Sequence, residues 1–131
     1  VIIGSGSYIT NRVVKNDAFL QHHFYNPDGS FIDSPNAVTI EKFKSITGIE
    51  ERRYVEDNLV TSDIGAIAAQ RAIEDAGIDP ETLDYIIVAN NFGDVKAGTT
   101  QSDLLPSLAS RIKQKLGIEN PNCVAYDVIY G

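Results

Sequence analysis

The fold is set by residues 61–89, TSDIGAIAAQRAIEDAGIDPETLDYIIVA, which predict a helix, a short connection and a strand. We expect the helix over Ser62 to Ala76, with Thr61 as its N-cap and Gly77 as the residue that ends it. Its apolar stripe is rich in alanine, which predicts close packing against another backbone. The stripe consists of Ile64, Ala68, Ala72 and Ala76, widened by Ile67 and Ala69. The apolar run from Tyr85 to Ala89 predicts a strand buried on both faces.

Similar signals place further strands and helices on both sides of this stretch. Strands are expected at residues 1–9, 52–55 and 124–129, and helices at residues 16–24, 39–46 and 106–115. Residues 90–102 are expected to form a long polar loop, and a loop of this length in a compact domain often has a function. The alternation of strands and helices predicts an α/β layered domain.

Length and composition are those of a single soluble domain spanning residues 1–131. Eighteen acidic residues against eleven lysines and arginines give a net charge of −7, which argues against nucleic acid as a partner. No apolar run approaches the roughly 18 residues of a membrane span. The first residues also lack the charged region of a signal peptide. We therefore expect a cytoplasmic protein that does not associate with membranes.

Three motifs have a chemical interpretation beside a structural one. Gly4-Ser5-Gly6 could form a phosphate-binding loop, but no third glycine follows at dinucleotide-binding spacing, so a tight turn is favoured. His22 and His23 have no further ligand type at metal-binding spacing, so a solvated helix end is favoured over a metal site. Glu50-Glu51-Arg52-Arg53 predicts a solvated turn with surface ion pairs, and binding of a phosphate or a carboxylate is the alternative.

The single cysteine, Cys123, excludes an intrachain disulfide and a cysteine-rich zinc site. No basic residue stands near it in the sequence, so we interpret it as a buried, inert thiol and not as a nucleophile. We expect neither a metal ion nor a cofactor.

Three segments together resemble the ketoacyl-acyl carrier protein synthase III group of the thiolase-like superfamily. The first, Ile46 to Tyr54 (ITGIEERRY), is similar to the T-G-I-x-E-R stretch of that group. The second runs from Thr61 to Ala89, and the third joins Leu116-Gly117-Ile118 to Ala125-Tyr126-Asp127-Val128. The resemblance covers nearly the whole chain in the right order, although residues 25–38 are longer than the usual pattern. It implies the N-terminal half of a thiolase-like fold, a layered mixed β-sheet with helices, cut before the central helix that bears the nucleophile.

The resemblance also implies a decarboxylative condensing enzyme of fatty acid or related secondary-metabolite synthesis. In this group a cysteine at a helix N-terminus takes an acyl group from a thioester, and the carbanion from malonyl-acyl carrier protein then condenses with it. That cysteine is expected just after Gly131, with its histidine and asparagine partners further downstream. No catalytic residue is therefore expected within this chain, which alone should be inactive, and Cys123 does not match the motif.

Candidate substrate-binding residues follow from the same resemblance: Lys42, Ile46, Thr47, Asn91 and Leu105. Lys42 stands where typical members have a tryptophan that stacks on adenine, and Ile46 where they have an arginine that contacts a phosphate. These two departures predict a primer borne by a carrier protein, or an unusual acyl primer, in place of an ordinary acyl-CoA. Leu105 corresponds to a residue that reaches across a dimer and shapes the partner's acyl pocket, and a core leucine beside a helix start is the alternative. Asn91 lies in the loop before it.

The implied partners are acyl carrier protein, an acyl thioester and a second copy of the chain in a homodimer. Two alternatives stand beside the condensing enzyme. One is another thiolase-fold acyltransferase that forms an ester or a hydroxymethylglutaryl product. The other is a non-catalytic subunit that uses the fold for dimerisation and control of chain length.

Overall fold

A computed structural model describes residues 1–130 of the chain. These residues form two compact units, one made of residues 10–55 and the other of residues 1–9 together with the chain from Glu56 onward. Each unit has its own helices and strands and is described by itself.

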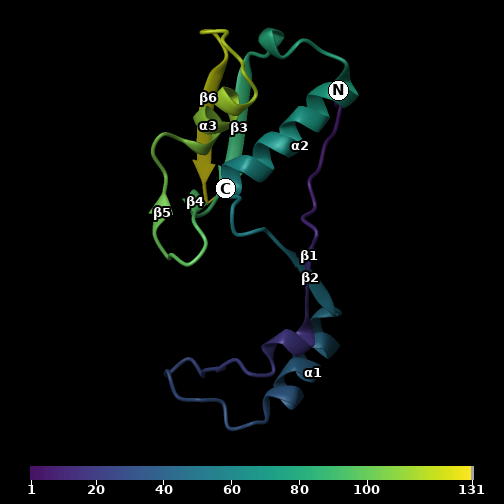
Figure 1. Cartoon of the computed structure of the whole chain (residues 1–131), viewed down its shortest axis with the longest axis vertical. Coiled ribbons are helices and arrows are strands. Elements are labelled where there is room, and N and C mark those ends of the chain that lie inside the picture. The colour runs from purple at the N-terminus through teal and green to yellow at the C-terminus, as the bar shows by residue number, and fades with distance from the viewer. Residues whose placement is uncertain (131) are drawn as a thin grey trace. The chain divides into compact units, whose positions relative to one another are not determined.

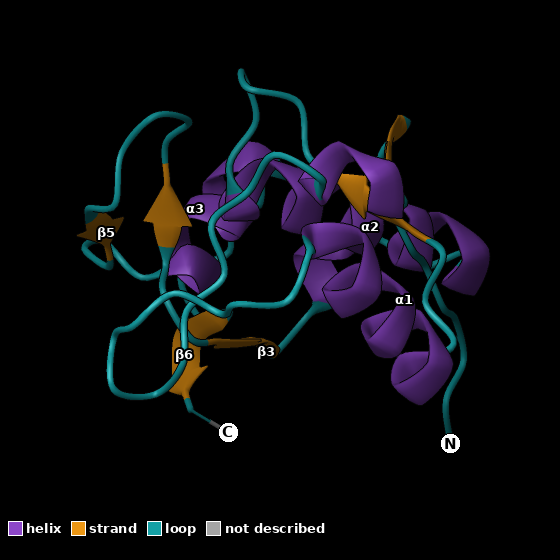
Figure 2. Ribbon diagram, turned by 90° about the horizontal axis from the view of Figure 1, so that it is seen from below, coloured by secondary structure: helices purple, strands orange, loops and turns teal. Residues whose placement is uncertain are grey.

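The larger unit is built on a pair of parallel strands, β3 (Tyr85–Asn90) and β6 (Val124–Ile129), which lie side by side in register (Figure 2). Parallel neighbours require a crossover connection, and helix α3 (Leu108–Lys115) lies within that connection and packs on both strands. Helix α2 (Thr61–Ala76) packs against α3, and the short 3-10 helix η2 (Pro80–Thr82) leads from it to β3 (Figure 1). The predicted strand at 124–129 and the predicted α/β layering are confirmed.

Only one face of this strand pair is covered within residues 1–130. Along β3, exposed and half-buried residues alternate: Tyr85 and Ile87 are 62% and 55% exposed, whereas Ile86 and Val88 are half-buried. The covered face carries Asp127 of β6, whose carboxylate contacts α3. The prediction of a strand buried on both faces is therefore wrong for the described residues, because α3 packs on one side of the pair.

The N-terminal segment lies against α2 at a distance that excludes side chains (Figure 1). A Cβ atom on Gly4 would stand 2.6 Å from the carbonyl oxygen of Ala72 and from the Cβ of Ala76. A Cβ on Gly6 would overlap the backbone of Ala68 and Ala72. The alanine stripe of α2 thus packs against another backbone, as predicted.

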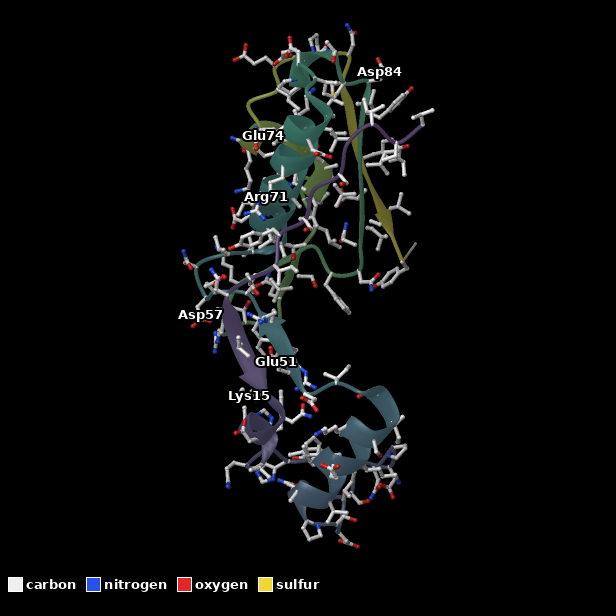
Figure 3. The ribbon with its side chains drawn as sticks, turned by 90° about the vertical axis from the view of Figure 1, so that its right-hand side faces the viewer. Lys15, Glu51, Asp57, Arg71, Glu74 and Asp84 are labelled. Carbon is white, nitrogen blue, oxygen red and sulfur yellow. The ribbon has the colours of Figure 1, made fainter. Side chains whose placement is uncertain are left out.

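Residues 1–9 are nevertheless not a strand, which corrects the sequence prediction. The segment is held by α2 and not by a strand ladder: the Ser5 amide donates to Asp75 at 2.8 Å, and Arg71 Nη1 donates to the Ser7 carbonyl at 2.6 Å (Figure 3). Close approach to a helix therefore accounts for the Gly-Ser-Gly motif, and the predicted tight turn is not formed.

Helix α2 begins one residue earlier than predicted. Val60 occupies the N-cap, and Thr61 lies inside the helix, with its Oγ1 donating to the Gly93 carbonyl at 2.9 Å. Gly77 ends the helix in the left-handed region, φ 64°, as predicted. Helix α3 begins two residues after the predicted Pro106, with Ser107 as the N-cap that accepts from the Ser110 amide.

The connection from β3 to α3 is not a plain loop. It contains a small antiparallel hairpin of β4 (Asp94–Val95) and β5 (Ser102–Asp103), in which Asp94 pairs with Asp103. The prediction of a loop over residues 90–102 is wrong here because two-residue strands carry no periodic pattern that a sequence can reveal.

The smaller unit pairs two short antiparallel strands, β1 (Arg12–Lys15) and β2 (Glu51–Tyr54), with Lys15 opposite Glu51 (Figure 3). Between them lie the 3-10 helix η1 (Asn16–Phe19) and helix α1 (Asn36–Thr47), which ends at Gly48 with φ 69°. The predicted elements change at four places in this unit. Strand β1 was not expected, and the strand expected at residues 52–55 is β2, one residue earlier. The helix expected over residues 16–24 is only η1, and α1 begins before residue 39.

Replacing Gly6 by alanine should destabilise the protein by about 1–3 kcal/mol, because the added methyl group forces the N-terminal segment away from α2. Equilibrium unfolding in urea measures this change. Ser5→Ala is the matched control, since the exposed Ser5 contributes its backbone amide to the contact with Asp75. Equal stability of the Gly6→Ala variant and the wild type would contradict the proposed close approach.

Candidate functional site

Three candidate substrate-binding residues lie on the C-terminal half of α1. Lys42 and Ile46 are one turn apart and share a face of the helix, and the Ile46 side chain is 70% exposed. Thr47 is also exposed, but its hydroxyl is engaged locally: it donates to the Phe43 carbonyl at 2.7 Å and accepts from the Ile49 amide at 3.1 Å. Lys42 and Ile46 thus present one surface, while the Thr47 hydroxyl stabilises the helix end.

The charge cluster after α1 forms surface ion pairs, as predicted, but Glu51, Arg52 and Arg53 lie in strand β2 and not in the predicted turn. Lys44 pairs with Glu50 at 3.0 Å, and Arg53 pairs with Glu51 at 3.3 Å. The hydrogen bond that Lys44 donates to the Glu50 carboxylate raises the pKa of Lys44. These exposed pairs contribute little to stability.

Arg52 behaves differently from its charged neighbours, because it is half-buried. Its Nη1 donates to Asn16 Oδ1 at 3.1 Å, and its guanidinium lies 4.9 Å from the ring centre of Phe19. Asn16 also donates to the Ile49 carbonyl at 2.8 Å. The arginine therefore ties β2 to η1 within the smaller unit.

The other two candidates, Asn91 and Leu105, belong to the larger unit. Asn91 is exposed directly after β3, and Leu105 is 85% exposed between β5 and α3. Both lie on the connection that contains the hairpin. Leu105 is therefore not a core leucine within residues 1–130.

A side chain that the sequence did not single out organises this connection. Arg111 of α3 donates from Nη1 to Asp94 at 2.9 Å and from Nη2 to Asp103 at 2.7 Å. It also donates from Nη2 to the Leu105 carbonyl and from Nε to the Pro106 carbonyl, both at 2.9 Å. All four acceptors belong to residues 94–106, and Leu105, Pro106 and Arg111 line one open cleft of about 720 Å³.

Asp94 connects the same network to α2. Its side chain is 6% exposed, and it accepts from the amide and from the hydroxyl of Ser62, both at 2.7 Å. Ser62 lies in the first turn of α2, where backbone N–H groups lack partners within the helix and favour negative charge. The carboxylate thus satisfies the start of α2 and pairs with Arg111.

Asp127 has the corresponding role for α3. It accepts from the amides of Leu108 and Ala109, both at 2.8 Å, and from the side chain of Asn90 at 3.2 Å. The strand pair and the first turn of α3 are therefore joined through one carboxylate.

Charge pairing shifts the pKa values of Arg111 and Asp103 at the exposed end of the arginine network. The hydrogen bond from Arg111 holds the pKa of the Asp103 carboxyl below its ordinary value. The same hydrogen bond raises the pKa of Arg111. Both groups are thus ionised at neutral pH.

Cys123 is 3% exposed, which confirms the prediction of a buried thiol. Lys113 donates to the carbonyl of Cys123 at 2.8 Å and to that of Asn120 at 2.7 Å, and so contacts the backbone there. The ring centre of His22 lies 5.0 Å from that of Phe19, and the ring centre of His23 lies 5.4 Å from that of Phe31.

Comparison with known proteins gives consistent matches along the chain. No family model matches the sequence. A beta-ketoacyl-[acyl-carrier-protein] synthase III of Clostridium acetobutylicum is 38% identical over 122 residues, which are 93% of this chain and 31% of the relative. The protein of the same name from Ehrlichia canis is 34% identical over 98% of this chain and 33% of its own length.

Solved structures match over a similar range. The priming beta-ketosynthase from the R1128 polyketide biosynthetic pathway superposes with a TM-score of 0.70 at 30% identity, over 98% of this chain and 31% of its own. The 3-oxoacyl-[acyl-carrier-protein] synthase III of Aquifex aeolicus gives a TM-score of 0.69 at 26% identity, over 98% of this chain and 34% of its own.

The chain is a homologue of part of ketoacyl-acyl carrier protein synthase III. It spans about one third of the length of the curated relatives it matches. The family resemblance stated from the three sequence motifs is confirmed, and so is the thiolase-like α/β fold class. No helix among residues 1–130 has the length and apolar character needed to span a lipid bilayer.

Sequence reasoning missed the two carboxylates and the arginine that organise the β3–α3 connection. Asp127 belongs to the third segment of the family resemblance, but the sequence did not predict that its carboxylate binds the first amides of α3. Asp94 and Arg111 gave no signal, because they are 17 residues apart and meet only through the fold.

The lowered pKa of Asp103 gives a direct test of the arginine network. The carboxyl should titrate below the ordinary value of about 3.9 in the wild type and return toward it in Arg111→Gln. Its contact with Arg111 should therefore persist at neutral pH and be lost only as the pH falls through the lowered pKa. Carbon-13 NMR titration of the Asp103 carboxyl measures both curves. Arg71→Gln is the control, and superimposable Asp103 curves for wild type and Arg111→Gln would contradict the assignment.

Proposed function

We propose that this chain is part of a decarboxylative condensing enzyme, an acyltransferase that joins an acyl primer to malonyl-acyl carrier protein in fatty acid or related secondary-metabolite synthesis. The observation that carries the proposal is the similarity to ketoacyl-acyl carrier protein synthase III over more than nine tenths of the chain. The retained T-G-I-x-E-R segment and the β6 strand with Asp127 support it.

The reaction follows from thioester chemistry. A cysteine thiolate attacks the carbonyl of an acyl thioester, the primer's thiol leaves, and an acyl-enzyme forms. Loss of CO₂ from malonyl-acyl carrier protein leaves a carbanion, which attacks the acyl-enzyme carbonyl and expels the cysteine thiolate. Hydrogen-bond donors stabilise the oxyanion in each attack. The cysteine, histidine and asparagine of this scheme belong to sequence that follows residue 131 in the proposed enzyme.

In this scheme the chain supplies substrate contacts. Lys42, Ile46 and Thr47 lie at the primer entrance, and Asn91 and Leu105 belong to the segment that shapes an acyl pocket. The proposed partners are acyl carrier protein, an acyl thioester and a second copy of the protein in a homodimer. The exposed positions of Lys42, Ile46 and Leu105 agree with these roles.

Lys42 and Ile46 lead to a prediction about the primer. The full-length wild type should condense an acyl group borne by carrier protein with malonyl-acyl carrier protein, releasing CO₂, and should use acetyl-CoA poorly. The double variant Lys42→Trp/Ile46→Arg should raise kcat/KM for acetyl-CoA by about tenfold, the effect of one charge-assisted contact of roughly 1.5 kcal/mol. Mass spectrometry of the carrier-bound product measures both reactions.

Lys44→Trp is the control for that experiment, since it adds the same ring to α1 at a residue that pairs with Glu50. Efficient self-acylation of the wild type from acetyl-CoA would contradict the primer prediction. A full-length protein that releases no CO₂ and forms no 3-oxoacyl product would contradict the proposed function. It would favour the non-catalytic subunit, whereas ester or hydroxymethylglutaryl products would favour the other acyltransferases.

Leu105 gives a second prediction. Leu105→Trp in the full-length enzyme should shift preference toward shorter acyl primers, because the larger side chain fills part of the pocket. A shift of about tenfold in relative kcat/KM corresponds to one methylene of discrimination. Competition between primers of increasing length measures the shift, with the neighbouring exposed Leu104→Trp as the control. Unchanged selectivity in Leu105→Trp would argue against a pocket role.

A further inference from the structure

Arg111 concentrates its hydrogen bonds on one short segment. The planar guanidinium has five N–H donors in a fixed fork, and its three nitrogens all donate to residues 94–106. Two of the acceptors, Asp94 and Asp103, face each other across the β4–β5 hairpin. The other two are the consecutive backbone carbonyls of Leu105 and Pro106. One side chain thus fixes both strands of the hairpin and the two residues that follow it.

The helix that carries Arg111 is itself firmly placed. Leu108 and Ala109 are fully buried and Ile112 is 4% exposed, so α3 has little freedom to move on the strand pair. Asp127 adds two hydrogen bonds to the first turn of the helix. The backbone of Arg111, one turn further along the helix, is therefore held in place.

The acidic end of the network is equally constrained. Asp94 is buried and accepts two hydrogen bonds from Ser62 of α2 while it pairs with Arg111. Breaking the Arg111 contact would leave a buried carboxylate with fewer partners, which disfavours any alternative position of the hairpin. Lysine could replace the charge of Arg111 but not its fork, since one ammonium cannot reach all four acceptors in their present geometry.

The position of Leu105 depends on this network. Its side chain is 85% exposed, so side-chain packing within the described residues contributes little to its position. The position of its Cβ is set by the backbone, and the carbonyls of residues 105 and 106 are both bound by Arg111. Movement of the guanidinium would therefore move Leu105 directly.

We propose that Arg111 is a positioning residue that fixes Leu105 and thereby sets the acyl-chain length that the enzyme accepts. This inference rests on the proposed function, in which Leu105 shapes an acyl pocket. When the four hydrogen bonds of Arg111 hold the segment, Leu105 stays in place and excludes a longer acyl chain. When the segment is loosened, Leu105 can move and the longer chain can enter. Selectivity for chain length requires the enzyme to distinguish primers that differ by one or two methylenes. A rigidly placed pocket wall can make that distinction.

The test compares Arg111→Lys with wild type in the full-length enzyme, using a series of acyl-acyl carrier protein primers that differ by two carbons. The ratio of kcat/KM for the longer primer to that for the shorter one should rise by about tenfold in Arg111→Lys. Hydrogen exchange of the amides of residues 102–106 should become faster in the same variant. Arg71→Lys is the matched control, because it makes the same change at an arginine that contacts the Ser7 carbonyl and the Tyr8 ring.

Asp103→Asn keeps the inference testable if Arg111→Lys does not fold. Asp103 is 55% exposed, and its replacement weakens one of the four contacts while it leaves the buried Asp94–Arg111 pair. A smaller shift in the same direction is expected. An active variant with faster exchange and wild-type selectivity would overturn the inference and leave the proposed function standing. A wild-type enzyme that condenses no acyl thioester would overturn both.

Discussion

Two carboxylates that come from strands satisfy the starts of two helices, and the larger unit depends on them. Asp127 of β6 receives the first amides of α3, and Asp94 of β4 receives an amide in the first turn of α2. Helix N-termini carry unpaired N–H groups and partial positive charge, so a carboxylate supplies both the acceptor and the complementary charge. The strand pair, both helices and the hairpin are thereby fixed relative to one another within this unit, and Arg111 extends the same charge pattern to the segment that bears Leu105.

Intrinsic signals in the sequence were enough to predict the long elements but not the first residue of each helix. The alanine stripe and Gly77 predicted α2, and the apolar run at 124–129 predicted β6, since each rests on a local pattern or on a residue's backbone preference. Strand β1 could not be predicted in this way, because RVVK has no alternation and becomes a strand only through its pairing with β2. The β4–β5 hairpin was not predicted for the same reason, because its two-residue strands form only through their pairing with each other and through their contacts with Arg111.

For the candidate site too, the motifs predicted which residues to consider, but not the contacts that those residues make. The family resemblance nominated Lys42, Ile46 and Leu105, and the structure adds that all three side chains are exposed. The same motifs could not show that the Thr47 hydroxyl is engaged by its own helix end. They also could not show that the Leu105 backbone is held by a residue six positions later, because such contacts depend on the turn that α3 makes after Pro106.

The contact between Gly4, Gly6 and α2 also bears on the order in which the chain acquires structure during synthesis. The Ser5 amide bonds to a residue 70 positions later, so the N-terminal segment leaves the ribosome well before the helix that holds it. At about 5–20 residues per second, that interval lasts roughly 4–14 s. For those seconds Gly4 and Gly6 have no α2 to lie against and the Ser5 amide has no Asp75 to bind, so the segment stays accessible in the nascent chain to chaperones and to other unfolded segments.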